Sequence, residues 1–170
     1  MAAAMKLAVV SPYPPGWRGV GDYARHIVQG LAALGGNDEI VVLAERVPGA
    51  PAIEQDGRTE IRRIWTRHQL ITPAVVLREL TRIQPDVVWY NVGLTVFGSG
   101  ASAFFALSMP ALTRAAGFRT VVTMHEVVDA VDVQAIGAPL GPVGRMAARL
   151  ATRLLLMADT VCVTLDSYRT

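Results

Sequence analysis

The fold is decided by residues 6–34, which run KLAVVSPYPPGWRGVGDYARHIVQGLAAL. The apolar, β-branched run at residues 6–11 predicts a buried strand. A loop rich in proline and glycine follows it, and from Gly21 onwards apolar residues recur at helical spacing until Gly35 and Gly36 end the pattern. A strand, a glycine-containing loop and a helix in this order predict the first unit of a Rossmann-like sheet.

The same alternation continues along the rest of the chain. We expect further strands at residues 39–44, 59–66, 86–90, 119–124 and 160–164, and further helices at residues 73–83, 102–116 and 142–157. Loops are expected at residues 47–57, 91–100 and 125–141. Apolar strands separated by helices imply right-handed crossovers and a sheet that is covered on both faces. The sequence therefore predicts an α/β fold, a doubly wound, mostly parallel Rossmann-like sheet, in a single domain of residues 1–170.

Composition narrows the class of protein. Apolar residues make up 52% of the 170 and charged residues 18%, which excludes a disordered chain. The net charge of +2 is small and Lys6 is the only lysine, so we do not expect a nucleic-acid partner. The single cysteine, Cys162, lies in an apolar run and is expected to be buried, which fits a reducing, cytoplasmic compartment.

No segment has the pattern of a signal peptide or a membrane span. Only four apolar residues follow Lys6, too few for the apolar core of a signal peptide. Residues 87–113 carry no charge, but Asn91, Pro110 and several glycines divide them into a strand, a loop and a helix.

Ligands of an open parallel sheet bind at the carboxyl ends of its strands. In the first loop at that edge, the backbone N–H groups of Gly19, Val20 and Gly21 lie where a helix begins, which predicts a phosphate site. The alternative is a surface loop in which Asp22 caps the helix.

Two later loops also follow strands. His125 and Glu126 come directly after one of them, and an imidazole there can transfer a proton or hydrogen-bond a sugar hydroxyl or a phosphate. The alternative is a polar pair that fixes the loop backbone. Together with Asp129 and Asp132 these residues have no convincing metal-ligand spacing, so no metal site is expected. Asn91 opens the other loop, which either shapes an acceptor pocket or is a tight crossover.

The order of these landmarks resembles the N-terminal domain of family 4-like glycosyltransferases of the GT-B type. The segments that carry the resemblance are GVGDYAR at residues 19–25, LAALG at 31–35, PDVVWYN at 85–91, TMHE at 123–126 and ADTVCVT at 158–164. Two positions depart from the family pattern. Gly19-Val20-Gly21 replaces the more usual pair of adjacent glycines, and Asn91 stands where a histidine is common.

The resemblance implies a retaining transfer of a sugar from a nucleotide-diphosphate donor to an acceptor. It assigns Gly19, Val20 and Gly21 to the donor phosphate and sugar, and His125 to a catalytic position near the reaction centre. Further residues are candidates for the acceptor side: Tyr13, Arg18, Tyr23, Asn91 and Glu126. No cofactor or metal is implied, and the partners are a nucleotide sugar and a glycan, lipid-linked or small-molecule acceptor.

The resemblance also implies a second, C-terminal domain that binds the nucleotide sugar. Its basic pair and Glu-x7-Glu segment have no counterpart in residues 1–170, and the chain stops directly after a predicted strand. We therefore expect a C-terminal domain outside residues 1–170, and we expect this fragment alone to be inactive.

Two other functional classes are also compatible with the sequence. A stand-alone Rossmann-like domain could serve as a binding or interaction module. A dinucleotide-dependent oxidoreductase is suggested by the match of residues 19–24 to a GxGxxA pattern, although seven residues separate Ser11 from Gly19 and only Glu45 is an acidic candidate for the ribose.

One helix also has a basic stripe. Arg145, Arg149 and Arg153 recur every four residues, which is typical of a solvated helix face and also of contact with an anionic membrane. We expect a cytoplasmic protein, with peripheral contact at the inner face of a membrane as the alternative.

Overall fold

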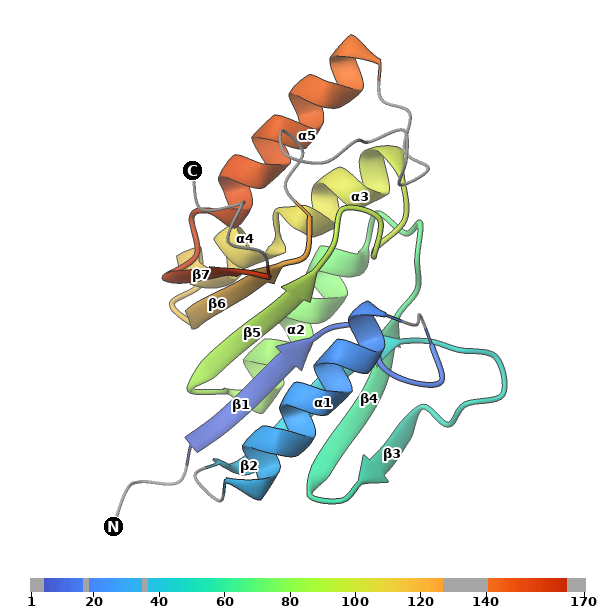
Figure 1. The fold of residues 1–170 in the computed structure, drawn as a ribbon, viewed down its shortest axis with the longest axis vertical. Helices are drawn as coiled ribbons and strands as arrows, with labels where there is room; N and C mark the ends of the chain where they lie inside the picture. Colours follow the sequence, from blue (N-terminus) through green and yellow to red (C-terminus); the bar gives the residue numbers. More distant parts are fainter. Residues whose placement is uncertain (1–4, 17–18, 35–36, 127–140, 165–170) are drawn as a thin grey trace.

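The computed structural model describes residues 5–16, 19–34, 37–126 and 141–164. Within them, seven strands form one sheet that is flanked by helices (Figure 1). The strands are β1 (Met5–Val10), β2 (Asn37–Glu45), β3 (Ile53–Asp56), β4 (Thr59–Trp65), β5 (Val87–Val92), β6 (Arg119–Met124) and β7 (Thr160–Val163). The helices are α1 (Val20–Ala33), α2 (Thr72–Ile83), α3 (Gly100–Leu107), α4 (Met109–Ala115) and α5 (Pro142–Leu155).

The sheet has the order β3-β4-β2-β1-β5-β6-β7. All neighbouring strands are parallel except β3 and β4, which form an antiparallel hairpin. This confirms the predicted α/β class and the mostly parallel sheet. From β1 the chain builds outward to β2 and β4, and it then returns to place β5 on the other side of β1. The boundary between β1 and β5 is thus the point where the strand order reverses, the usual place of ligand crevices in such folds.

Two hydrophobic clusters lie on opposite faces of the sheet. On one face, Ala24 and Val28 of α1 pack against alternate residues of β1 and β2, such as Val9 and Val42. On the other face, α2, α3, α4 and α5 cover the remaining alternate residues of the central strands. Because both faces of the central strands are covered, residues 7–10 of β1 and 40–44 of β2 are all apolar and buried.

The prediction of one continuous helix at residues 102–116 was wrong. The structure divides it into α3 and α4, which meet at Ser108. Pro110 lies in the first turn of α4, where its missing N–H costs nothing, whereas within a continuous helix it would remove a hydrogen bond and clash with the preceding turn.

The structure also corrects three smaller predictions. Residues 53–56 form β3 rather than part of a loop, and the two-residue turn that joins β3 to β4 is Gly57-Arg58, with Gly57 at φ 64° in its first position, where a positive φ favours glycine. Asn91 lies inside β5 rather than in the following loop. Cys162 is exposed, because it lies beside Thr123 on the α1 face of the sheet, and no described helix covers β7 on that face.

The long uncharged segment at residues 87–113 forms β5, α3 and part of α4 with their connections. None of the helices in the described part of the chain is both long and apolar enough to cross a membrane.

Candidate active site

Asn91 joins three segments at the carboxyl edge of the sheet. Its side chain is buried, and its Nδ2 donates to Ser11 Oγ at 3.0 Å and to the Val20 carbonyl at 2.9 Å. Its Oδ1 lies 2.7 Å from Nε2 of His125. One amide therefore connects the end of β1, the start of α1 and the residue after β6, at the point where the strand order reverses.

His125 is held by its backbone as well as by its ring. Its N–H donates to the Val92 carbonyl at 3.1 Å, and its ring meets the Tyr23 ring edge-on at a centroid distance of 4.9 Å. Burial lowers the pKa of His125 below its ordinary value of 6.5, while the Glu126 carboxylate opposes that shift. The imidazole is thus neutral near pH 7 and lies beside the start of α1.

The start of α1 has the backbone geometry that glycine permits. Gly19 has φ 76°, a region that other residues rarely adopt, and its carbonyl accepts the first helical hydrogen bond from Tyr23 N at 2.9 Å. The N–H groups of Val20 and Gly21 precede that bond and are not part of the helical ladder. The Gly19 N–H, in contrast, donates to the Asp22 carboxylate at 3.1 Å, as the capping alternative predicted.

Glu126 connects two loops at the same edge. Its Oε2 accepts the Leu94 N–H at 2.9 Å, and a Cβ added at Gly93 would lie 2.6 Å from that oxygen. This contact fixes the backbone of the loop after β5. Glu126 therefore behaves as in the alternative given for the His125-Glu126 pair, in which the pair fixes the loop backbone.

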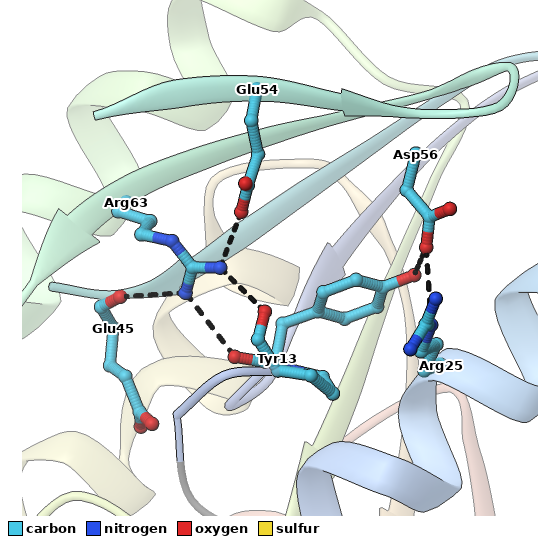
Figure 2. Close-up of polar contacts among 7 residues, drawn as sticks. Tyr13, Arg25, Glu45, Glu54, Asp56 and Arg63 are labelled. Atoms are coloured by element: carbon cyan, nitrogen blue, oxygen red, sulfur yellow. Dashed lines mark hydrogen bonds and ion pairs between the residues drawn. The ribbon is translucent and has the colours of Figure 1, made fainter. Parts of the chain in front are cut away.

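Tyr13 is buried and its hydroxyl faces β3. It donates to Asp56 Oδ2 at 3.2 Å, and the same oxygen accepts Arg25 Nε from α1 at 3.3 Å (Figure 2). Burial and the neighbouring Asp56 carboxylate raise the pKa of Tyr13, so the phenol stays protonated. The acceptor-side candidate Tyr13 is therefore engaged in a contact that ties the loop after β1 to the β3 hairpin.

Arg63 is a residue of this region that the sequence analysis missed. It is 2% exposed, and its guanidinium donates to the carbonyls of Tyr13 at 3.2 Å, Pro14 at 2.6 Å and Glu45 at 3.3 Å. It also pairs with the Glu54 carboxylate of β3 (Figure 2). The sequence signal that could have revealed its burial is its position in β4. Arg63 lies two residues from both Ile61 and Trp65, which are buried on the same face of the strand.

The acceptor-side candidate Arg18 lies outside the described ranges, as do Asp129 and Asp132, for which no metal site was expected. Within those ranges, no group of three or more His, Cys, Asp or Glu side chains is arranged to hold a metal ion.

Residues 18–170 match the family described as a glycosyl transferase 4-like domain. No curated protein sequence matched. A structure of sucrose-phosphate synthase from Thermosynechococcus elongatus has a TM-score of 0.62 at 15% identity, covering 92% of this chain and 41% of that one. A second structure of that synthase has a TM-score of 0.56 at 14% identity, covering 96% of this chain and 78% of that one.

These identities are low enough that the structural likeness shows the fold alone. The chain spans 41% of the first synthase chain, so it corresponds to a part of that protein. The family match, in contrast, covers nearly the whole sequence. The chain belongs to the glycosyl transferase 4-like domain family and has the fold of a Rossmann-like half of a GT-B glycosyltransferase.

Proposed function

We propose that this chain is the N-terminal, acceptor-side domain of a retaining glycosyltransferase that moves a sugar from a nucleotide-diphosphate donor to an acceptor. The observation that carries the proposal is the Asn91 side chain, which brings His125 and the start of α1 together at the carboxyl edge of the sheet. The family match and the fold likeness to sucrose-phosphate synthase support the same class of enzyme.

The chemistry expected of these groups suits a leaving diphosphate. Negative charge develops on the phosphate as the bond to the sugar breaks, and N–H groups at a helix start stabilise such charge. Val20 and Gly21 supply N–H groups that precede the helical ladder, and Gly21 is buried. In this proposal these groups and the helix end act without a cofactor, while His125 binds the donor next to the reacting carbon.

The proposal assigns most contacts to the nucleotide to a second, C-terminal domain. The resemblance places a basic pair and a Glu-x7-Glu segment there, and residues 1–170 contain no match to them. A donor bound between two domains would be excluded from water only when both are present. We therefore expect sugar transfer from the complete protein and not from residues 1–170 alone.

The dinucleotide alternative is disfavoured by Glu45. An acidic residue that binds a ribose at the end of the second strand must be open to the ligand. Glu45 is 5% exposed, and a Cβ added at Gly16 would lie 1.9 Å from its Oε1, so the loop after β1 covers this carboxylate. A thermal-shift panel of nucleotide sugars and nicotinamide dinucleotides tests this assignment. Stabilisation by a nucleotide sugar alone supports the transferase, and stabilisation by a nicotinamide dinucleotide alone contradicts it.

We also propose that the protein is cytoplasmic and that α5 contacts an anionic membrane surface. Arg145, Arg149 and Arg153 are all exposed on this helix. Met146 and Leu150 lie beside them on the same solvent-facing side and are 68% and 48% exposed. Cationic and large apolar side chains on one exposed helix face are the pattern of an interfacial helix, which supports peripheral binding.

A further inference from the structure

The orientation of the Asn91 amide is determined by the Val20 carbonyl. A carbonyl oxygen can only accept a hydrogen bond, so the Asn91 atom that lies 2.9 Å from it must be the NH2 group. The second hydrogen of that group is taken by Ser11 Oγ at 3.0 Å. A reversed amide would place two acceptors against each other in a buried setting and lose the bond to Val20. The amide oxygen of Asn91 therefore faces His125.

This orientation determines which nitrogen of His125 carries hydrogen. The amide oxygen only accepts, and it lies 2.7 Å from Nε2, so Nε2 must be the N–H donor. In a neutral imidazole the other nitrogen, Nδ1, then has a lone pair. Within the described part of the chain, no residue hydrogen-bonds Nδ1. It is thus the ring nitrogen that remains for a ligand.

We infer that Asn91 is a positioning residue, which fixes neutral His125 in the Nε2–H form so that Nδ1 accepts a hydrogen bond from a ligand hydroxyl. The inference rests on the proposed function for the identity of that ligand, a sugar. A lone pair attracts a hydroxyl hydrogen and repels a phosphate oxygen. Of the two groups that the sequence analysis left open for His125, the geometry therefore selects a sugar hydroxyl over the diphosphate.

The surroundings of Asn91 make this arrangement rigid. Asn91 and Ser11 are both fully buried, and β5 is a central strand that pairs with β1 and β6. The groups that face the imidazole among the described residues are the Tyr23 ring, the Asn91 oxygen and the nearby Glu126 carboxylate. Only Glu126 is charged, and one of its oxygens is engaged by the Leu94 N–H.

The first test determines the tautomer directly in the complete protein labelled with 15N-histidine. The His125 signals are identified by their loss in His125→Gln, and nitrogens with and without hydrogen resonate in separate regions of a long-range 1H–15N spectrum. Above the pKa of His125, we expect hydrogen on Nε2 alone. Hydrogen on Nδ1 would overturn the inference.

The same spectrum tests whether Asn91 causes the preference. In Asn91→Ala the two nitrogen resonances should move toward each other because both tautomers become populated. An unchanged separation would show that Asn91 does not determine the tautomer. Thr123→Val is the matched control, since it removes a buried hydrogen bond from Trp89 Nε1 on the neighbouring strand without altering Asn91. A shift of the same size in Thr123→Val would also count against a specific role for Asn91.

The second test leaves Asn91 intact and compares His125→Asn with His125→Gln. The amide of Asn takes roughly the place of Nδ1, and the amide of Gln takes roughly the place of Nε2. We expect the Asn variant to retain a kcat/KM about ten-fold higher, the rate equivalent of one hydrogen bond. Equal rates, or a faster Gln variant, would overturn the assignment of Nδ1 to the ligand. If the complete protein transfers no sugar, the proposed function fails, and the tautomer spectrum still decides the role of Asn91.

Discussion

Arg63 donates from Nη1 to the carbonyl oxygen of Tyr13 at 3.2 Å, across fifty residues of sequence. The guanidinium is almost fully buried, and it also binds the carbonyl of Pro14 at 2.6 Å. Tyr13 and Pro14, in the loop after β1, are therefore held by Arg63 of β4, which is itself paired with Glu54 of β3. These contacts support the described residues 11–16 of this loop at the edge of the candidate site.

Arg63→Met tests this support. The substitution removes the guanidinium that binds the carbonyls of Tyr13, Pro14 and Glu45 and the Glu54 carboxylate. A hydrogen bond from a charged group contributes about 1.5–3 kcal/mol. We expect a loss of that size in the free energy of unfolding, measured with urea. Arg62→Met is the matched control on the same strand, because its pairs with Glu60 and Glu79 are partly exposed and should contribute about 1 kcal/mol or less. Equal losses in both variants would contradict the role of Arg63.

Gly19→Ala tests the backbone at the start of α1. Gly19 has φ 76° and ψ −86°, a region that residues with a side chain adopt at a cost of about 1–3 kcal/mol, so we expect a loss of stability of that size. Gly30→Ala is the control, because Gly30 lies inside α1 and an added Cβ would meet no atom within 4 Å. That change should stabilise the protein by up to about 1 kcal/mol. Gly19→Ala with wild-type stability in a thermal or urea unfolding curve would show that the positive φ is not required.

The pH dependence of transfer tests the environment of His125. Burial lowers its pKa in the folded protein below 6.5, so the neutral form persists to more acidic pH than in a free histidine. The acidic limb of kcat/KM, which reports the free enzyme, should therefore have an apparent pKa below 6.5. An acidic limb above 6.5 would contradict the neutral imidazole.

The same shift predicts a stability window with a definite sign. Between the lowered pKa of the folded state and the ordinary value of 6.5, the unfolded chain binds more protons than the folded one. The contribution of His125 is therefore fully present above pH 6.5 and is lost as the pH falls through the folded pKa. Urea unfolding of the wild type and of His125→Gln across this range should diverge in slope, and parallel curves would contradict the shift.

Binding of α5 to membranes is tested with sedimentation on anionic vesicles. Simultaneous replacement of Arg145, Arg149 and Arg153 by Gln should abolish co-sedimentation, because each basic residue near an anionic surface contributes about 1 kcal/mol. The control replaces Arg46, Arg78 and Arg82, which are exposed on other parts of the surface, and should leave binding intact. Equal sedimentation of wild type and the α5 variant would remove the membrane proposal.

Much of the fold follows from local patterns. The apolar runs of β1, β2, β5 and β6 predict buried parallel strands, because a strand covered on both faces has few polar positions. The placement of Gly19 and His125 at one edge follows from the same topology, since the carboxyl ends of parallel strands share an edge. Pro110 could also have predicted the break at Ser108, because a proline inside a helix removes a hydrogen bond and clashes with the preceding turn.

Contacts between distant segments could not be predicted in this way. The hydrogen bond between Ser11 and Asn91 could not be predicted from the sequence. The two residues are eighty positions apart, and only the pairing of β1 with β5 brings them together. β3 has four residues and alternates between exposed and half-exposed positions, so it lacks an apolar signature. Burial of Arg63 likewise depends on β3 and on the loop after β1, which lie on either side of its guanidinium.

The central claim is that His125 lies at the reaction centre of a glycosyltransferase. The most direct measurement is the release of nucleoside diphosphate from a panel of nucleotide sugars by the complete protein, with a panel of sugar acceptors, in the wild type and in His125→Ala. We predict turnover by the wild type with at least one donor, and a decrease of at least about ten-fold in a His125→Ala variant whose circular dichroism and thermal unfolding match the wild type. Turnover that is unchanged in His125→Ala would contradict the account.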